Sequence, residues 1–478
     1  MTDQPNIVLV VLDTMRKDVL GAYSGKARTP VFDMVAKDST VYHNAIAPAP
    51  HTVPSHACLF TGKYSSEHGV HETYERKGPE LLMAMNEVAF ETLPETLKRR
   101  GYNTIGISAN PLLFPGSGYD RGFNFFSTVE ERGISTSDRE AINQASRYGK
   151  GPKEIVWYLL MHGKINELVK LYSLYRNIKR NEKAINYPSV KGGDRIVHTL
   201  LHSKLEQPFF LFLNFMEMHE PYTDYEQRLS TNLANELPSQ HGVAMNDLLG
   251  IKKIPDKILS EIRRKYYSSA STLDTFFGQM IDYLKKNKLY DNSIIIITSD
   301  HGQALKERNY YGHGIFLYNE IVEIPLIVKY PNSRILTQME SGYQSLTSIP
   351  YMIDNILENA SNSDLLSKEA AFSESFGIPH RRLAPDVRRR FDISSKAIYK
   401  NSFKLVVSWP DLEVQEFEYK GKPVDPVEHR SVADSLISNL LEVFDVNHGK
   451  STDGSSSISF EPEEELEMIE RLRKLGYV

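Results

Sequence analysis

The sequence is poor in cysteine, with a single one among 478 residues. An intrachain disulfide needs two cysteines, so the chain is not a disulfide scaffold, and such low usage is typical of a reducing compartment. The sequence also has no excess of positive charge, because its net charge is −5 at pH 7. No global basic field draws such a chain to nucleic acid. We therefore expect no nucleic-acid partner.

Long apolar runs are missing as well. No run approaches the roughly 18 residues that a membrane span needs. Residues 1–13 lack the basic and apolar regions of a signal peptide. We expect a soluble, cytoplasmic protein, and the sequence leaves its state as monomer or oligomer open. The rest is ordinary globular composition, with 41% hydrophobic and 24% charged residues.

Several short apolar segments predict buried strands. They are continuously apolar rather than alternating, as expected of strands that are covered on both faces. The segments are residues 6–12, 103–108, 208–215, 293–299 and 324–330. Stretches with a helical pattern, such as residues 91–100 and 269–286, lie between them. This alternation predicts an α/β fold with a mostly parallel sheet sandwiched by helices.

Residues 150–185 have a composition of their own, in which tryptophan and tyrosine are mixed with lysine and arginine. We interpret them as a helical insertion. One reading is an amphipathic helix pair that covers the sheet. The other is a lid, or a surface for an anionic partner.

The pattern changes again after about residue 370. Residues 396–409 and 413–419 resemble antiparallel strands with a polar face, and residues 463–475 form a charged segment that predicts a closing helix. We therefore expect a large domain over residues 1–370. A smaller C-terminal α+β subdomain would follow over residues 371–478.

Polar side chains follow the predicted strands at the point where each one ends. Asp13 follows the first strand, Asn110 the second, and Asp300 and His301 the fourth. In open α/β sheets, ligands bind beyond the carboxyl ends of the strands. A single Asp or Asn in such a place is often a helix cap. Two metal-ligand types side by side after an isoleucine run instead indicate a metal and anion site.

Residues 52–62 (TVPSHACLFTG) predict a short helix. Pro54 suits the first helical position and Gly62 the position after the helix end. Thr52 would then lie at the helix N-terminus, where backbone N–H groups favour anions. Beside a metal ion, its hydroxyl can ionise and attack an anionic ester. The alternative is that Thr52 only caps the helix.

Four stretches in this order resemble the sulfatase-like branch of the alkaline phosphatase superfamily. They are residues 12–18 (LDTMRKD), 52–62, 215–222 (FMEMHEPY) and 299–314, which contain SDHG and GHG. The resemblance implies an alkaline-phosphatase-like fold and a metal-dependent ester hydrolase. It also implies that the substrate is a small anionic ester.

The resemblance also implies a set of site residues. One divalent metal would be bound by Asp13, Thr52, Asp300 and His301, a set of three oxygens and one nitrogen that favours Mn²⁺ or Zn²⁺ over Mg²⁺ or Ca²⁺. His219 and His313 would contact the ester oxygens or protonate the leaving group, unless they are turn residues. Further expected contacts of the substrate are Asn110, Lys63 and Glu217. Lys63 and the nearby His51, His68 and His71 either line the anion pocket or form a solvated face.

The departures from the family pattern bear on the reaction. Sulfatases oxidise a Cys or Ser to formylglycine at the position of Thr52, whereas oxidation of threonine would give a ketone. His56, included among the catalytic residues, replaces the arginine of the signature. We therefore expect a hydrolase of phosphate esters, preferably phosphodiesters or phosphonate monoesters, with Thr52 as nucleophile. The alternatives are a sulfatase that uses unmodified threonine, a phospho-headgroup transferase, and a binding protein without catalysis.

Overall fold

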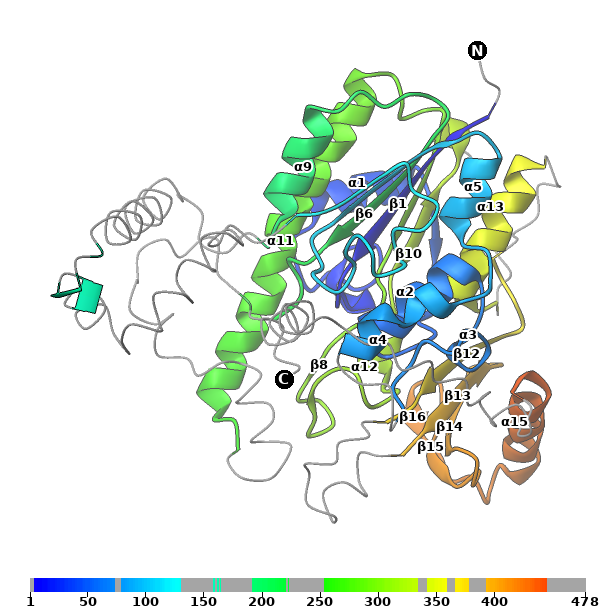
Figure 1. Ribbon diagram of the computed structural model, residues 1–478. Coiled ribbons are helices and arrows are strands. Elements are labelled where there is room, and N and C mark those ends of the chain that lie inside the picture. Colours follow the sequence, from blue (N-terminus) through cyan, green and yellow to red (C-terminus); the bar gives the residue numbers. More distant parts are fainter. Residues whose placement is uncertain are drawn as a thin grey trace.

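The computed structural model describes the parts of the chain that form its sheets and most of its helices (Figure 1). The described residues are 4–73, 79–129, 158–159, 161–162, 164, 191–220, 222, 253–333, 342–358, 366–377 and 393–444. Most of the insertion predicted over residues 150–185 lies outside these ranges, as does the closing helix predicted over residues 463–475.

A central sheet of seven strands forms the middle layer of the molecule. In spatial order its strands are β2 (Thr40–Tyr42), β10 (Leu326–Lys329), β7 (Ser293–Thr298), β1 (Asn6–Leu12), β6 (Phe209–Phe215), β4 (Asn103–Ser108) and β5 (Phe125–Thr128). The five strands from β7 to β5 are parallel, whereas β10 runs antiparallel to both of its neighbours. The predicted mostly parallel sheet is therefore confirmed.

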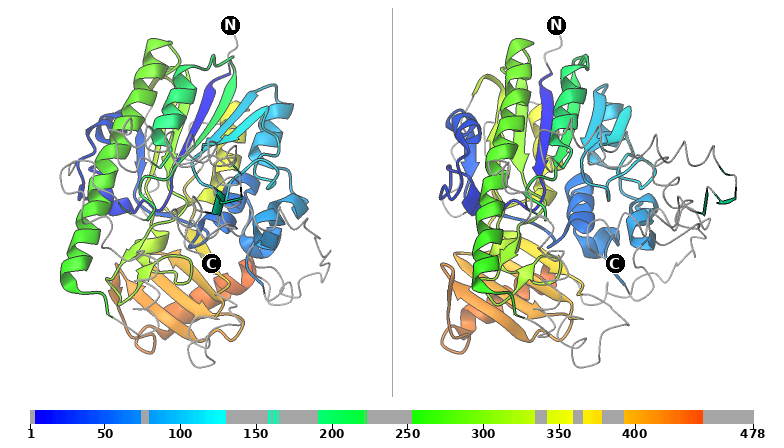
Figure 2. Two further views of the ribbon diagram at one scale, coloured as in Figure 1. Left: turned by 60° about the vertical axis from the view of Figure 1, so that its left-hand side comes forward. Right: turned by 90° about the vertical axis from the view of Figure 1, so that its left-hand side faces the viewer.

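Helices cover both faces of this sheet (Figures 1 and 2). One face carries α1 (Pro30–Lys37), α9 (Gly193–Leu201) and α11 (Asp256–Lys286), and the other carries α2 (Thr52–Thr61), α5 (Leu93–Arg99) and α13 (Ile349–Leu357). Val8 and Leu12 of β1 belong to the first core. Ile7 and Val11 belong to the second. Successive side chains of a strand point to opposite faces, so a strand covered on both sides is apolar throughout.

Smaller elements complete this part of the chain. They are the helices α3 (Ser65–His68), α4 (Pro79–Met83) and α12 (Asn319–Val322), the pair β3 (Ala45–Ile46) with β11 (Gln344–Ser345), and the pair β8 (Ala304–Leu305) with β9 (Tyr311–Gly312). In the described part of the chain, no helix is both long enough and apolar enough to cross a membrane.

A second, antiparallel sheet forms the C-terminal part and lies at one end of the central sheet (Figure 2). Its strands are β12 (Ala370–Ser375), β13 (Ser395–Lys400), β14 (Phe403–Ser408), β15 (Val414–Tyr419) and β16 (Lys422–Pro423), and α15 (Arg430–Val443) packs on it. The predicted stretch over residues 396–409 forms the two strands β13 and β14, because Asn401 and Ser402 turn the chain with φ of 52° and 66°. A separate antiparallel sheet is confirmed, whereas a domain boundary at residue 370 stays a prediction.

Candidate active site

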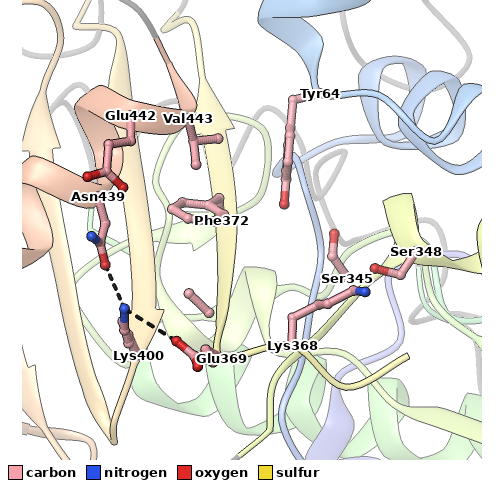
Figure 3. A pocket seen from close by; sticks show the side chains of 11 residues that line it. Tyr64, Ser345, Ser348, Lys368, Glu369, Phe372, Lys400, Asn439, Glu442 and Val443 are labelled. Atoms are coloured by element: carbon pink, nitrogen blue, oxygen red, sulfur yellow. Dashed lines mark hydrogen bonds and ion pairs between the residues drawn. The ribbon is translucent and has the colours of Figure 1, made fainter. Parts of the chain in front are cut away.

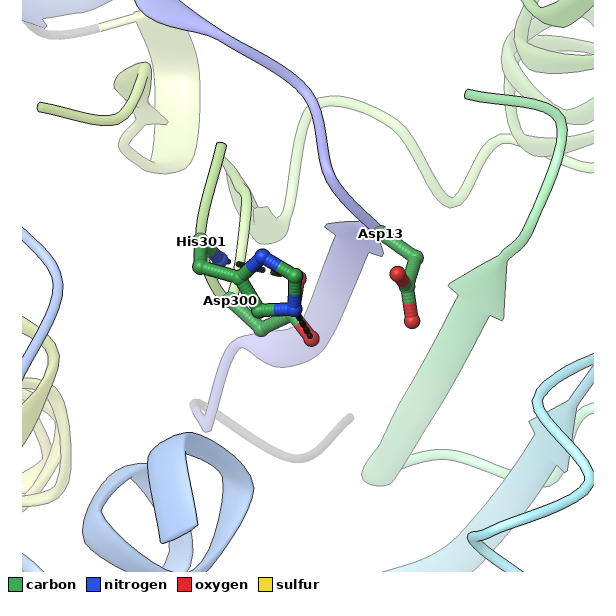
Figure 4. A group of neighbouring side chains, drawn as sticks. All are labelled: Asp13, Asp300 and His301. Carbon is green, nitrogen blue, oxygen red and sulfur yellow. Dashed lines mark hydrogen bonds and ion pairs between the residues drawn. The ribbon is translucent and has the colours of Figure 1, made fainter. Parts of the chain in front are cut away.

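Three potential metal ligands converge at the carboxyl ends of two adjacent strands. Asp13 directly follows β1, while Asp300 and His301 lie just beyond the end of β7. Because β1 and β7 are parallel neighbours, these ends meet at one edge of the sheet. All three side chains are buried, and their ligand atoms lie within 4.8 Å of one another (Figure 4). This edge is where the sequence predicts a metal site.

In the carboxylates of Asp13 and Asp300, one oxygen accepts hydrogen bonds and the other has no hydrogen-bond partner among the described residues. The amides of Thr14 and His301 donate to Asp300 Oδ1 at 3.3 and 2.9 Å, and Asn110 Nδ2 donates to Asp13 Oδ2 at 2.6 Å. Among the described residues, Asp300 Oδ2 and Asp13 Oδ1 have no hydrogen-bond partner. Buried polar atoms of this kind are costly unless a further partner binds them. They are the free donor atoms of the group.

His301 is fixed in the tautomer that a metal ligand needs. Its Nδ1 lies 2.9 Å from the backbone oxygen of Gly302, which only accepts hydrogen bonds, so the proton is on Nδ1. Nε2 therefore keeps its lone pair and faces Asp300 Oδ2 at 3.5 Å. Burial lowers the pKa of His301 to about 4, which keeps the ring neutral.

The electrostatics of the group also favour a cation. Burial and the nearby Asp300 raise the pKa of Asp13 to about 8, and burial raises the pKa of Asp300 to about 7. Two carboxyl groups in so dry a place lose their protons readily only when positive charge lies beside them. Two carboxylate oxygens and one imidazole nitrogen are donors that Mn²⁺ and Zn²⁺ accept. The residues present therefore fit a divalent metal.

Thr52 is the first residue of α2 and faces this group. Its Oγ1 lies 3.5 Å from Asp13 Oδ2 and 3.4 Å from His301 Nε2. The N-cap residue is His51. Pro54 is the third residue of the helix, whereas the sequence pattern predicts it as the first. The interpretation of Thr52 as the helix cap is therefore wrong. Its hydroxyl points to the metal group.

His56 lies one turn further along α2 and beneath Thr52. Its ring is fully buried, and its Nδ1 donates to the backbone oxygen of Thr52 at 3.0 Å. The same nitrogen lies 3.6 Å from Asp300 Oδ2. Burial lowers the pKa of His56 to about 3, so the ring is neutral at ordinary pH. His56 therefore does not supply the positive charge of the arginine that it replaces.

His219 and His313 lie beside the metal group. The ring centroids of His219 and His313 are 5.3 Å apart, and those of His313 and His301 are 4.5 Å apart. Nδ1 of His219 donates to the backbone oxygen of Glu220 at 2.7 Å, and Nδ1 of His313 donates to Gln303 Oε1 at 2.6 Å. Both contacts fix the orientation of the rings. The structure thus brings these two histidines and Thr52 to one place.

Asn110 also belongs to this group, because its Nδ2 contacts both Asp13 and, at 3.5 Å, Thr52 Oγ1. Oε1 of Glu217 accepts the N–H of Gly193 at 2.9 Å, at the start of α9. Its other carboxylate oxygen has no hydrogen-bond partner among the described residues. Burial raises the pKa of Glu217 to about 7.

The structure does not bring Lys63 to the site. Gly62 ends α2 in the left-handed conformation, with φ of 69°, as its position in the sequence predicts. Lys63 follows it, and a ten-residue helix is about 15 Å long, so Lys63 and Thr52 lie at opposite ends of α2. Nζ of Lys63 pairs with Glu67 at 3.3 Å.

The remaining histidines near the signature have separate surroundings. His51 Nε2 pairs with Glu72 Oε2 at 3.0 Å, and His51 directly precedes the nucleophile candidate. His68 is buried and accepts the N–H of Val70 at 3.0 Å. His71 stacks on Phe376 at 3.6 Å between ring centroids. The structure does not bring His68 or His71 into the group around Asp13.

Two residues at the site, Tyr266 and Lys191, carry no motif that the sequence reveals. Thr14 has φ of 57°, which is strained for a β-branched residue, and its amide binds Asp300. Tyr266 holds this turn by donating to the Thr14 backbone oxygen at 2.9 Å. Lys191 is buried near Asp13 and His219. It lies outside the predicted apolar strands and outside the four stretches that resemble the family.

A cavity of about 380 Å³ lies away from this group (Figure 3). It opens between the catalytic part and the C-terminal sheet, and its lining includes Tyr64, Lys368, Phe372, Lys400 and Asn439. None of the residues around Asp13 lines it. The cavity is thus separate from the metal group.

Comparison with known proteins gives the family. The model of the family described as "Sulfatase" matches residues 5–357, so the chain belongs to the sulfatase family. It is 22% identical to an N-acetylglucosamine-6-O-sulfatase of Bacteroides thetaiotaomicron, over 90% of this chain and 83% of that protein. It is 23% identical to an arylsulfatase of Clostridium perfringens, over 75% of each chain.

Solved structures share the fold. A phosphonate monoester hydrolase of Agrobacterium radiobacter superimposes with a TM-score of 0.60 at 17% identity, covering 93% of this chain and 96% of that one. A putative sulfatase of Bacteroides thetaiotaomicron gives a TM-score of 0.61 at 13% identity, covering 97% and 96%. The protein is a sulfatase-family ester hydrolase, with a buried Asp–Asp–His group that is consistent with a metal site.

Proposed function

We propose that this hydrolase cleaves phosphate esters, preferably phosphodiesters or phosphonate monoesters, with Thr52 as the nucleophile. The observation that carries the proposal is the position of Thr52 Oγ1, 3.5 Å from Asp13 Oδ2 and 3.4 Å from His301 Nε2 at the start of α2. A threonine cannot be oxidised to the aldehyde that sulfatases use. An unmodified hydroxyl is therefore the attacking group.

Asp13, Asp300 and His301 would hold one divalent metal, Mn²⁺ or Zn²⁺ by preference, with Thr52 Oγ1 as a fourth donor. When bound, such a cation lowers the pKa of a coordinated hydroxyl and offsets negative charge that develops on the ester. Asn110 keeps the Asp13 carboxylate in place through its 2.6 Å hydrogen bond and leaves Oδ1 free for the metal.

The reaction then has two steps. Nε2 of His219 or His313 carries no proton while Nδ1 donates, so it can take the proton of Thr52 Oγ1. Thr52 Oγ1 bonds to phosphorus as the bond to the leaving oxygen breaks, a phosphothreonine forms, and the same Nε2 gives its proton to the leaving oxygen. A water molecule next bonds to phosphorus, and one of its protons passes by way of the histidine to Thr52 Oγ1 as the bond to Thr52 breaks. The Nδ1 hydrogen bonds of the two histidines hold both rings ready for the proton transfers.

A second candidate is a sulfatase that works with unmodified threonine. It is supported by the relatives in sequence, an N-acetylglucosamine-6-O-sulfatase and an arylsulfatase. The phosphonate monoester hydrolase among the similar structures supports the first candidate. Sulfate and phosphate esters have similar shapes, so the metal group alone suits both.

One substrate panel separates the two candidates. The Mn²⁺-loaded and Zn²⁺-loaded protein is assayed on an aryl phosphodiester, an aryl phosphonate monoester, an aryl monophosphate and an aryl sulfate. We expect kcat/KM to be highest for the diester or the phosphonate. A kcat/KM that is far higher for the aryl sulfate would reject the first candidate in favour of the second. The Thr52→Ala variant controls for contaminating hydrolases.

A further inference from the structure

Gln303 is a fully buried glutamine that the proposed reaction leaves without a role. It lies in the loop after β7, and Glu220 lies in the loop after β6; in the sheet, β1 separates these two strands. Both ends of the Gln303 amide are in use. Its Oε1 lies 2.6 Å from Nδ1 of His313, and its Nε2 donates to Glu220 Oε2 at 3.5 Å. The side chain therefore connects Glu220 with a histidine of the site.

The carboxylate of Glu220 determines which way the Gln303 amide faces. An ionised carboxylate only accepts hydrogen bonds, so the NH₂ end of the amide faces Glu220 and the oxygen faces His313. An amide oxygen also only accepts, so the ring proton of His313 is on Nδ1. Nε2 then carries the lone pair that can take up a proton. Glu220 thus sets the tautomer of His313 through Gln303.

The backbone of Gln303 and that of Glu220 are fixed as well. The backbone oxygen of Glu220 accepts the Nδ1 proton of His219 at 2.7 Å. The backbone oxygen of Gln303 accepts from Nη1 of Arg16, in the loop after β1, at 3.3 Å. The loops after β1, β6 and β7 are therefore joined around Gln303, and its side chain has a fixed base from which to hold the ring of His313.

Of the two histidines, His313 is better placed to exchange a proton at the ester. Its ring centroid is 4.5 Å from that of His301, whose Nε2 lies 3.4 Å from Thr52 Oγ1. His219 is 1% exposed, whereas His313 is partly exposed. A leaving group has to reach solvent, and His313 is the member of the pair that borders it.

We propose that Gln303 and Glu220 are positioning residues for the ring of His313, and that His313 rather than His219 exchanges the proton with the leaving oxygen. This inference rests on the proposed function. With Nδ1 held by Gln303, Nε2 takes the proton of Thr52 Oγ1 and gives it to the leaving oxygen, so the ring ends the step as it began. Without the amide oxygen, the ring can turn or carry its proton on Nε2, and the transfer slows.

Two leaving groups of different basicity test this role. The Mn²⁺-loaded wild type and Gln303→Met are assayed on a phenyl phosphodiester and on its 4-nitrophenyl analogue. Phenolate is the more basic leaving group and depends more on receiving a proton. We expect kcat/KM of Gln303→Met to fall about tenfold to a hundredfold on the phenyl ester and much less on the 4-nitrophenyl ester. The metal content should equal that of the wild type.

Variants of Glu220 show whether it acts through Gln303. Glu220→Gln keeps the backbone oxygen that holds His219. If Glu220 acts through Gln303, combining Glu220→Gln with Gln303→Met gives an enzyme no slower than Gln303→Met alone. The exchange of Gln303→Glu with Glu220→Gln places a carboxylate between His313 and an amide donor. We expect this exchange to recover most of the loss on the phenyl ester.

The two histidines are compared in the same assay. His313→Ala should show the leaving-group dependence of Gln303→Met, and adding Gln303→Met to it should cause no further loss. A dependence that appears in His219→Ala and not in His313→Ala would assign the proton transfer to His219 and reject the inference.

Gln344→Met is the matched control. Gln344 of β11 is also a buried glutamine, and its Nε2 donates to the Gly342 backbone oxygen and to Ser367 Oγ at 3.3 and 2.7 Å. This variant makes the same substitution at a glutamine with no printed contact to His313 or Glu220. We expect it to keep the wild-type ratio of kcat/KM for the two leaving groups. Its melting temperature shows what the loss of a buried amide does to stability alone.

Other results overturn the inference. An equal fall for both leaving groups, no fall, or a loss of metal in Gln303→Met would show that Gln303 does not act through His313. If Gln303→Met does not fold, Glu220→Gln and the exchange decide, and the absence of a leaving-group dependence in Glu220→Gln rejects the role. A preference of the wild type for aryl sulfates rejects the proposed function instead. The phenyl and 4-nitrophenyl sulfates then test Gln303 in the same way.

Discussion

At the scale of single residues, the position of the Thr52 hydroxyl supports its proposed role as the nucleophile. Because His51 is the N-cap of α2, removal of the Thr52 hydroxyl takes no cap from the helix. We expect Thr52→Ala to lower kcat on an aryl phosphodiester by at least about a hundredfold. Thr52→Ser keeps the oxygen and retains part of the activity. Steady-state kinetics and the melting temperature are measured on the same preparations.

A structural role would give the reverse pattern for Thr52. Nearly normal turnover of Thr52→Ala together with a clearly lower melting temperature would remove Thr52 from the reaction. The neighbouring Ser55 provides the control variant, Ser55→Ala. Its Oγ donates to the backbone oxygen of Asp300 at 2.7 Å, so this variant loses a buried hydroxyl of α2 and keeps the nucleophile.

Asp13 and Asp300 lead to a prediction about metal. Without either carboxylate the group has too few donors, and we expect Asp13→Ala and Asp300→Ala to lose the bound metal while the fold persists. A ligand that binds only the folded state raises its stability. Added Mn²⁺ should therefore raise the melting temperature of the stripped wild type and leave that of both variants unchanged. Stoichiometric metal in both variants, by elemental analysis, would mean that the site lies elsewhere.

The sequence identifies site residues well where a strand end fixes their place. Asp13, Asp300 and His301 were found because each follows a buried apolar strand. Lys63 is near Thr52 in sequence, yet the length of α2 separates them. Lys191 has no such signal, because a loop residue comes close to Asp13 only through the folding of distant segments.

At the scale of helices and strands, burial decides what the sequence reveals. The predicted segments that became β1, β4, β6, β7 and β10 are almost fully buried. The edge strands β2 and β5 were not predicted, since one is three residues long and the other is partly exposed. The reversal of β10 also has no local signal, because a strand buried on both faces looks the same in either direction.

Lys404 of β14 gives a prediction on pH at this scale. Burial lowers its pKa to about 7, from an ordinary value near 10.5. The unfolded chain therefore binds more protons at Lys404 than the folded one between about pH 7 and 10, so the free energy of unfolding rises with pH in this window. We expect Lys404→Met to have a smaller slope.

Denaturant titrations at pH 7, 8, 9 and 10 measure this slope. Lys420→Met is the control, because Lys420 lies on the exposed turn after β15. An identical slope for the wild type and Lys404→Met would show that the folded state does not depress the pKa of Lys404.

At the scale of the whole molecule, Arg308 joins the catalytic part to the C-terminal sheet. Its guanidinium pairs with Glu416, and with Glu418 at 2.7 Å, both from β15, and lies 3.6 Å from Glu320 of α12. The segment that bears Arg308 runs from His301 to His313. The C-terminal sheet therefore supports the loop that carries two of the site histidines.

Arg308→Met tests this support. Loss of a partly buried cation leaves the paired carboxylates without a partner, and we expect a decrease of about 2 kcal/mol in the free energy of unfolding. The displaced loop should also lower kcat. The control is Arg430→Met, since Arg430 and Asp434 form an exposed pair of little energetic weight. A stability and kcat equal to those of the control would show that the two parts are joined by other contacts.

The burial of Cys58 makes the chain suitable for selective chemical labelling. It is the sole cysteine, it lies inside α2, and burial raises the pKa of its thiol well above the ordinary range. Alkylating reagents react with thiolates, so we expect Cys58 not to react with them in the folded protein. A cysteine introduced by Thr52→Cys would lie at the N-terminus of α2, where the helix dipole favours a thiolate, so a small alkylating reagent would distinguish it from Cys58. Its rate of alkylation, with and without Mn²⁺, would report how accessible and how ionised the nucleophile position is.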